Sequence, residues 1–155
     1  MARRPRKPSM PVAPRLHDTI RLSAEGLAKV LGDLEARVLR TVWALGRPVS
    51  ARQVHEAVVE EHEVALLTVI TVLNKLVDKG ILARAKRDDV YHYNALWSPE
   101  AFVAHASRRV VEGVLPFDPG AVMASFVDVL AERNPDRLAE LAQLVRRKMR
   151  EQADG

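Results

Sequence analysis

The chain has 155 residues, of which 48% are hydrophobic and 28% charged, and its formal net charge at pH 7 is +4. The hydrophobic content excludes a wholly disordered chain, and no run approaches the roughly 20 apolar residues that span a bilayer. The absence of cysteine excludes disulfides, thiolate metal sites and cysteine nucleophiles. The basic start lacks the continuous apolar segment of a secretory signal, so we expect a cytoplasmic protein.

The basic charge is concentrated at the N-terminus. Residues 1–32 carry seven basic and two acidic side chains, whereas residues 33–155 carry 17 basic and 18 acidic ones. Because clustered Arg, Lys and Pro cannot bury a core, we expect residues 1–30 to form a basic, disordered extension. This extension is either a solvated tail or an arm that binds the phosphates or the minor groove of DNA.

A short helical piece in "SAEGLAKVL" (residues 23–31) follows the extension, and two predicted helices come after it. The run "GDLEARVLRTVWALG" (residues 32–46) has apolar side chains at helical spacing and glycine at its end, which predicts a first helix. The next four residues, "RPVS", predict a brief extended segment. Ser50 and Gln53 then have the spacing of a capping box, so a second helix begins there.

The segment "VALLTVITVLNKLVDKGIL" (residues 64–82) is rich in Val, Ile and Thr, which favour strands. It is too long for a strand, however, and Val69, Val72 and Leu76 recur at helical spacing. We therefore predict a third helix over residues 67–79, ended by Gly80. Its opposite flank is small, polar and weakly charged.

The next segment, "ILARAKRDDVYHYNAL", has two β-capable runs around a charged turn and predicts a hairpin. Three helices followed by a hairpin is the order of a winged helix-turn-helix. Three further helices are predicted, introduced by Ser98-Pro99, Asp118-Pro119 and Asn134-Pro135. The expected fold is mainly α, with a winged helix-turn-helix DNA-binding domain (31–97), a C-terminal three-helix dimerisation region (98–150) and a flexible end (151–155).

The polar flank of the third helix has the character of a surface that reads DNA. The second helix of a helix-turn-helix places its N-terminal residues against base edges in the major groove. Thr methyl groups can contact thymine, Asn can pair with adenine, and Lys suits guanine or phosphate. The candidate recognition residues are Leu67, Thr68, Ile70, Thr71, Asn74 and Lys75. The alternative is an ordinary amphipathic helix whose flank faces water.

The hairpin adds cations beside this helix. Arg84 and Lys86 are two residues apart and share one face of a strand, and Arg87 lies at the tip. Such a wing contacts phosphates, although Asp88 and Asp89 oppose it electrostatically. The candidate residues for contacts with the DNA backbone are Ser50, Arg52, Arg84, Lys86 and Arg87. The alternative for the wing is a solvated hairpin tip.

Catalytic and metal-binding patterns do not occur. The sequence has no GxSxG motif, no phosphate-binding loop and no dinucleotide fingerprint. His55 and His62 are seven residues apart, too far along a helix to share a zinc ion easily. We therefore predict no enzyme, no metal site and no cofactor, and stoichiometric zinc in the purified protein would contradict this.

The C-terminal helices carry more apolar surface than three short elements can hide. Leaving several such side chains in water would cost on the order of 10 kcal/mol, which pairing with a second copy removes. The candidate dimer-interface residues are Phe102, Val110, Val114, Phe126, Val129, Leu130, Leu138, Leu141, Leu144 and Val145. The alternative is that these helices fold back on the winged domain.

Two runs of this chain carry a family resemblance, "LGDLEARVLRTVWALGRPVSARQVHEAV" and "TVITVLNKLVDKGILARAKRDDVYHYNAL". They resemble the BlaI/MecI/CopY penicillinase-repressor family clearly over about residues 31–96. Leu67 stands where many members carry a basic residue, and the copper-responsive branch's C-terminal cysteine motif is absent. The matching positions are Leu34, Glu35, Val38, Trp43, Val49, Val54, Thr68, Val69, Thr71, Leu73, Asn74, Lys75, Leu76, Lys79, Gly80, Leu82 and Tyr93.

The resemblance implies a winged-helix repressor with dimerising C-terminal helices. It also implies a membrane-bound sensor protease as a partner, and a β-lactamase-type or other stress-response gene set as the target. The resulting hypothesis is a homodimeric, sequence-specific repressor on a palindromic double-stranded DNA operator. The alternatives are a protein-interaction module that uses the winged helix without DNA, and a ligand-responsive regulator not controlled by proteolysis.

Overall fold

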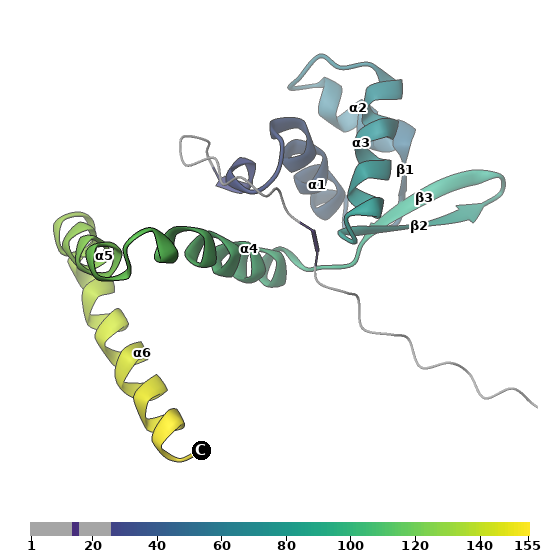
Figure 1. Cartoon of the computed structure of the whole chain (residues 1–155). Coiled ribbons are helices and arrows are strands. Elements are labelled where there is room, and N and C mark those ends of the chain that lie inside the picture. Colours follow the sequence, from purple (N-terminus) through teal and green to yellow (C-terminus); the bar gives the residue numbers. More distant parts are fainter. Residues whose placement is uncertain (1–13, 16–25) are drawn as a thin grey trace, which may run out of the picture. The chain divides into compact units, whose positions relative to one another are not determined.

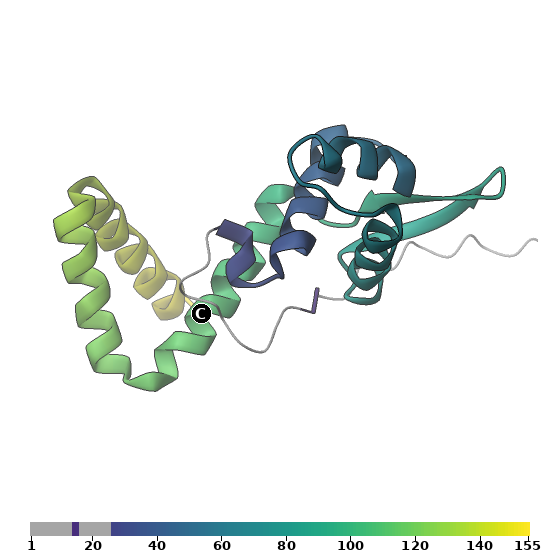
Figure 2. The same ribbon diagram turned by 90° about the horizontal axis from the view of Figure 1, so that it is seen from above.

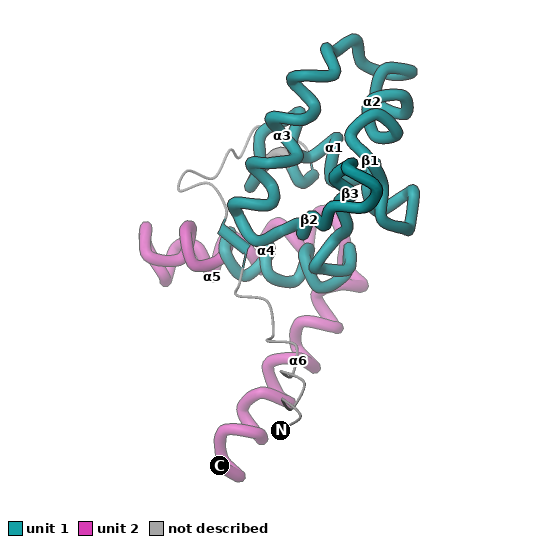
Figure 3. Tube along the Cα trace, turned by 90° about the vertical axis from the view of Figure 1, so that its right-hand side faces the viewer, with its two compact units in different colours: residues 1–110 teal, residues 111–155 magenta. Residues whose placement is uncertain are grey.

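The computed structural model describes residues 14–15 and 26–155 (Figure 1). The chain forms two compact units, one running to Val110 and the other spanning Val111–Gly155 (Figure 3). The expected disordered extension lies outside the described residues, apart from Pro14, Arg15 and the residues from Gly26 onward. The short helical piece expected around residues 23–31 is a single 3₁₀ turn, η1 (Gly26–Lys29), within the described part.

Three helices form the body of the first unit: α1 (Asp33–Leu45), α2 (Ala51–Val59) and α3 (Leu66–Asp78). Gly46 ends α1 with a left-handed φ of 66°, a conformation that glycine adopts without steric cost. The predicted capping box of α2 is confirmed. The Gln53 amide donates to the Ser50 hydroxyl at 3.3 Å, and the Ser50 amide donates to the Gln53 side chain at 2.9 Å.

A small antiparallel sheet completes the winged helix-turn-helix, which confirms the expected fold. Its strands are β1 (Val49–Ser50), β2 (Leu82–Arg87) and β3 (Val90–Ala95), in the order β1-β3-β2. The hairpin of β2 and β3 extends past the cluster of helices in both views (Figures 1 and 2). Asp88 and Asp89 make its two-residue turn, with φ values of 48° and 63°.

The core of the first unit lies between the three helices and the base of the hairpin. Each helix contributes the apolar face that its periodicity predicts, and the strands contribute residues at their inner ends. The largest fully enclosed side chains are Phe102, Leu31, Leu39, Leu73, Leu76, Ile81, Leu82, Val38, Val49, Val54, Val58 and Val69.

Helix α4 (Pro99–Val114) contributes its first turns to this core. Phe102 is fully buried, and its ring lies edge-on to Trp43 with the ring centroids 5.7 Å apart. The indole N–H of Trp43 donates to the Trp97 carbonyl at 2.9 Å, and that of Trp97 donates to the Gly80 carbonyl at 3.0 Å. The first unit therefore extends to Val110, whereas the sequence suggested a boundary after residue 97.

The second unit contains the end of α4, a 3₁₀ turn η2 (Leu115–Phe117), α5 (Pro119–Arg133) and α6 (Pro135–Ala153). Asp118 caps α5 by accepting the Ala121 amide at 3.0 Å. Residues 151–153 of the end expected to be flexible (151–155) are helical, because α6 continues to Ala153. Ion pairs from Glu151 to Arg147 and Lys148, at 3.9 and 3.6 Å, join neighbouring turns there.

Candidate nucleic-acid interface

Helix α3 has one buried face and one exposed face, as its sequence pattern predicts. Val69, Leu73 and Leu76 are fully buried, and Val72 is nearly so. Leu67 is 73% exposed, the largest exposed fraction among the large apolar side chains of the first unit's described residues. Thr68, Thr71 and Lys75 are also exposed, whereas Ile70 and Asn74 are half-buried. The candidate recognition residues thus divide into an outer set and two residues at its margin.

The hydroxyl of Thr71 is already engaged within α3. Its Oγ1 donates to the Leu67 carbonyl at 3.0 Å, a bond to the preceding turn of the helix. This bond uses the hydroxyl proton but leaves the oxygen lone pairs and the methyl group exposed. In this arrangement Thr71 can accept a hydrogen bond or contact an apolar group.

Asn74 differs from what the sequence suggested. Its Oδ1 accepts hydrogen bonds from Arg84 Nη1 at 2.8 Å and from the Tyr93 hydroxyl at 3.0 Å. A bidentate pair with adenine needs this same oxygen as an acceptor, and both of its lone pairs are occupied. Asn74 therefore joins α3 to the hairpin, and the expected pairing with adenine does not fit this arrangement.

Arg84 and Lys86 lie on one face of the hairpin, as their spacing predicts. In the register of β2 and β3, Arg84 is opposite Tyr93 and Lys86 is opposite Tyr91. The Arg84 guanidinium carbon lies 4.6 Å from the centre of the Tyr91 ring, and Lys86 Nζ lies 5.8 Å from it. Neither tyrosine was predicted from the sequence to lie beside the wing cations, although the alternation of β3 places them on one face.

The wing cations are not equally available to a ligand. Arg84 is engaged by Asn74 and Tyr91, so it is less free to bind a phosphate than the sequence suggested. Lys86 is exposed, and its Nζ lies 3.9 Å from Asp89 Oδ1 in an ion pair whose attraction is screened by solvent. Arg87, at the end of β2, is exposed as well. Lys86 and Arg87 are therefore the stronger candidates for phosphate contacts.

A groove lies between the start of α2, helix α3 and the hairpin. Its volume is about 490 Å³, and both apolar and polar side chains line it, among them Arg52, Leu66, Ile70 and Tyr91. Arg52 is exposed in the first turn of α2, where the helix dipole also favours an anion. The Ser50 hydroxyl is committed to the capping box. Arg52, the candidate residue of α2 for contacts with the DNA backbone, therefore lines the same groove as residues of the wing.

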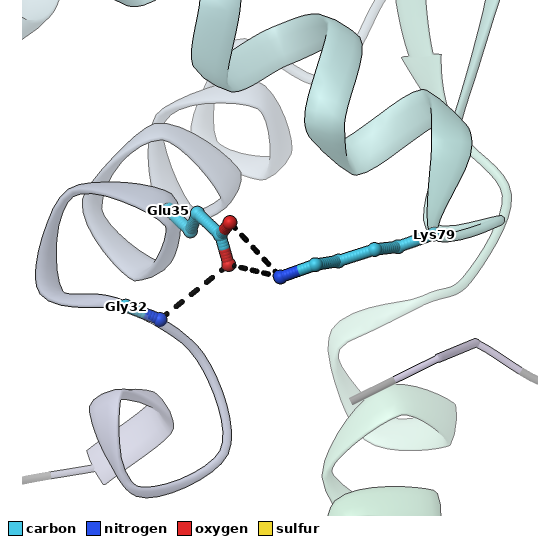
Figure 4. Close-up of polar contacts among 3 residues, drawn as sticks. All are labelled: Gly32, Glu35 and Lys79. Carbon is cyan, nitrogen blue, oxygen red and sulfur yellow. Dashed lines mark hydrogen bonds and ion pairs between the residues drawn. The ribbon is translucent and has the colours of Figure 1, made fainter. Parts of the chain in front are cut away.

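The C-terminal end of α3 is fixed by two contacts that the sequence did not predict. Lys79 Nζ lies 2.9 and 2.7 Å from the two carboxylate oxygens of Glu35, and Glu35 also accepts the Gly32 amide at 3.4 Å (Figure 4). The Arg15 amide donates to the Lys79 carbonyl at 2.8 Å, and the Arg15 guanidinium donates to the Asp78 carbonyl. A cation at these terminal carbonyls complements the helix dipole.

His55 lies in α2, and His62 lies in the segment that follows this helix. His55 Nε2 donates to the Val64 carbonyl at 2.8 Å, which ties α2 to the segment before α3. Among the described residues, no three His, Asp or Glu side chains are placed to hold a metal ion. None of the helices in the described part of the chain is both long enough and apolar enough to cross a membrane.

The candidate dimer-interface residues fall in both units. The prediction that Phe102 lies in the dimer interface is wrong, because this residue is fully buried in the core of its own winged domain and has no surface for a partner. Val110 packs partly against the same core. In the second unit, Phe126, Val129, Leu144 and Val145 are 56%, 48%, 50% and 48% exposed. The remaining candidates, half-buried in this unit, are Val114, Leu130, Leu138 and Leu141.

Comparisons with known proteins identify the family of this chain. The family model described as "Penicillinase repressor" matches residues 31–147. The chain is also 31% identical over 126 residues to two curated relatives, each described as "Transcriptional regulator BlaI", from the CDC 1551 / Oshkosh and H37Rv strains of Mycobacterium tuberculosis. These alignments cover 80% of this chain and 78% of each relative. The chain belongs to the penicillinase repressor family.

Proposed function

We propose that this member of the penicillinase repressor family is a sequence-specific transcriptional repressor that binds a palindromic DNA operator as a homodimer. The observation that carries the proposal is the outer face of α3, where Leu67 is 73% exposed beside Thr68 and Thr71. An exposed leucine among small hydroxyl side chains suits the edges of base pairs, where thymine presents a methyl group. Lys86 and Arg87 of the neighbouring wing suit the phosphates.

The second unit supports the dimeric part of the proposal. None of the side chains in residues 111–155 is buried, although this stretch contains many large apolar residues. Each such side chain would gain about 1.5–3 kcal/mol from full burial, so a surface built from several favours association. A second copy of the chain supplies the same surface through a two-fold axis.

A two-fold dimer determines the form of the operator. Two α3 helices related by a two-fold axis require inverted half-sites whose centres are about one or two turns of DNA apart. The genes beside such sites would identify the regulon, for which the family resemblance implies a β-lactamase-type or other stress-response set. The resemblance also implies release from DNA by a membrane-bound sensor protease.

The direct experiment combines footprinting of the protein on its own chromosome with selection from random DNA. We expect one enriched palindrome in both, and the protein should bind it at least about 10³-fold more tightly than random DNA. Enrichment of no sequence at moderate salt would contradict the proposal and favour a protein-interaction module.

Two variants and a charge-matched control assign the roles within the interface. Thr71→Ala should relax the preference at one base position in each half-site. Lys86→Ala should weaken binding to operator and random DNA alike, and lower the salt slope by about one per subunit. Arg137→Ala removes the same charge from α6, where Arg137 pairs with Glu140 at 2.6 Å, and should leave both properties unchanged.

A further inference from the structure

One carbonyl oxygen connects the exposed helix to the wing. Asn74 Oδ1 accepts one hydrogen bond from Arg84 of β2 and another from Tyr93 of β3, at 2.8 and 3.0 Å. Arg84 and Tyr93 are directly opposite each other in the hairpin register. The two strands are therefore held to α3 at the same level of the hairpin.

The two side chains that donate to Asn74 Oδ1 differ in burial, so the contacts lead from the core toward the tip of the wing. Tyr93 is only 2% exposed and belongs to the core, so its hydroxyl is fixed near the base of the hairpin. Arg84 is exposed, and its guanidinium continues the contact outward by lying over the Tyr91 ring. Lys86 Nζ lies 5.8 Å from the centre of the same Tyr91 ring. A chain of contacts thus runs from α3 to the cations near the wing tip.

We propose that Asn74 is a positioning residue that sets the angle of the wing relative to α3, and that it acts through its acceptor oxygen without reading a base. The hairpin of β2 and β3 extends past the helices (Figures 1 and 2), and the residues of its tip are exposed. The Asn74 contact aligns the phosphate-binding cations of the wing with the base-reading surface of α3. The part of this inference that concerns DNA rests on the proposed function.

The distinguishing variants are Asn74→Asp and Asn74→Ala. Aspartate keeps an oxygen that accepts from Arg84 and Tyr93, but it lacks the amide N–H that a pair with adenine requires. Alanine removes the acceptor altogether. A positioning role therefore predicts that Asn74→Asp keeps the hairpin contacts and the base preferences of the original protein, whereas a base-reading role predicts that both variants lose the same base preference.

The first measurement is amide hydrogen exchange in the free protein, without DNA. We expect Asn74→Ala to speed exchange in residues 83–94 by about 10-fold, because two hydrogen bonds that hold the hairpin are lost. Asn74→Asp should remain within about twofold of the original protein. Unchanged exchange in Asn74→Ala would overturn the proposal. Because no DNA is present, this result is independent of whether the proposed repressor function is correct.

The second measurement is binding to the selected operator over a range of salt. Asn74→Ala should lose about 10- to 30-fold in affinity and give a shallower salt slope, with its base preferences unchanged. Asn74→Asp should keep the original base preferences, although its added negative charge should weaken binding to operator and random DNA alike. Loss of the same base preference in both variants, at an unchanged slope, would overturn the positioning role in favour of base reading.

A double-variant cycle tests the route of the coupling. Tyr93→Phe removes one of the two donors while keeping the buried ring. If Tyr93 acts through Asn74, the double variant Asn74→Ala/Tyr93→Phe should lose no more affinity than Asn74→Ala alone. Additive losses would overturn the shared contact. Thr71→Ala, one turn earlier on the outer face of α3, is the matched control and should leave hairpin exchange unchanged.

Discussion

Glu35 and Lys79 join the start of α1 to the end of α3 through a two-pronged ion pair, with Nζ–oxygen distances of 2.9 and 2.7 Å (Figure 4). The two side chains are 11% and 22% exposed, so solvent screens their attraction only partly. The pair fixes the C-terminal end of the helix that we propose to enter DNA. The rest of the domain thereby determines the angle at which the opposite end of α3 projects.

Removing one partner of this pair should destabilise the fold. Glu35→Gln leaves the Lys79 ammonium partly buried without its counter-charge, and we expect the free energy of unfolding to fall by about 1–3 kcal/mol. Urea denaturation measures this change. Glu61→Gln is the control, because Glu61 pairs with Arg37 at 3.2 Å but is 80% exposed. Its effect should stay below about 1 kcal/mol, and equal effects would contradict the account.

We predict that replacing the two residues of the wing turn relieves backbone strain and tightens DNA binding. Asp88 and Asp89 both adopt positive φ, and together they place two negative charges beside the wing cations. Asp88→Asn with Asp89→Gly should relieve about 1 kcal/mol of backbone strain and release Lys86 from its ion pair. We expect tighter binding to both operator and random DNA, with the gain shrinking as salt increases.

A charge-matched control separates these effects. Asp128→Asn with Glu132→Gln removes the same charge from exposed positions of α5. Binding titrations at several salt concentrations compare the two double variants. An equal gain from the α5 variant would mean that overall charge, and not the position of the wing, accounts for the change.

Leu67 is expected to contact a thymine methyl group. Replacing thymine by uracil removes only that methyl group, so it should weaken binding of the original protein by about fourfold at one position in each half-site. The Leu67→Ala variant should bind both versions of the operator equally. Equilibrium titrations with the substituted duplexes measure this, and the same uracil effect in both proteins would show that another residue makes the contact.

The second unit is predicted to be the site of dimerisation. Phe126→Glu places a charge among exposed apolar side chains, and we expect it to yield monomers in sedimentation equilibrium while the winged domain stays folded. Gln143→Glu adds the same charge at an exposed polar position of α6 and should remain dimeric. A dimer of unchanged stability in Phe126→Glu would place the interface elsewhere.

Phe102 should behave as a core residue. Phe102→Ala leaves a cavity beside Trp43, so we expect the free energy of unfolding of the winged domain to fall by about 3–5 kcal/mol. Denaturation monitored at several protein concentrations separates this loss from a change in association. A dissociation constant that rises while domain stability is unchanged would restore Phe102 to the interface.

The elements of the winged domain could be predicted because their ends carry local signals. Gly46 and Gly80 adopt left-handed conformations, and Ser50 with Gln53 forms a capping box that depends only on neighbours in sequence. The apolar spacing of α3 outweighed the strand propensity of its Val, Ile and Thr residues, because tertiary burial of one face decides the structure.

The sequence did not predict the contacts that form where distant segments meet. Asn74 Oδ1 contacts Arg84 and Tyr93, which lie 10 and 19 residues further along the chain and come together through the hairpin register. The apolar stripe of α4 identified a face to be covered, but periodicity does not say whether the chain or a partner covers it. Phe102 was therefore placed in the dimer interface instead of the domain core.

The structure of the protein bound to its selected operator is the most direct test of the central claim, which is that the outer face of α3 reads the major groove. We predict Leu67, Thr68 and Thr71 within contact distance of base edges, with Lys86 and Arg87 beside phosphates. A complex in which α3 lies outside the major groove, or in which these three side chains point away from the bases, would contradict it.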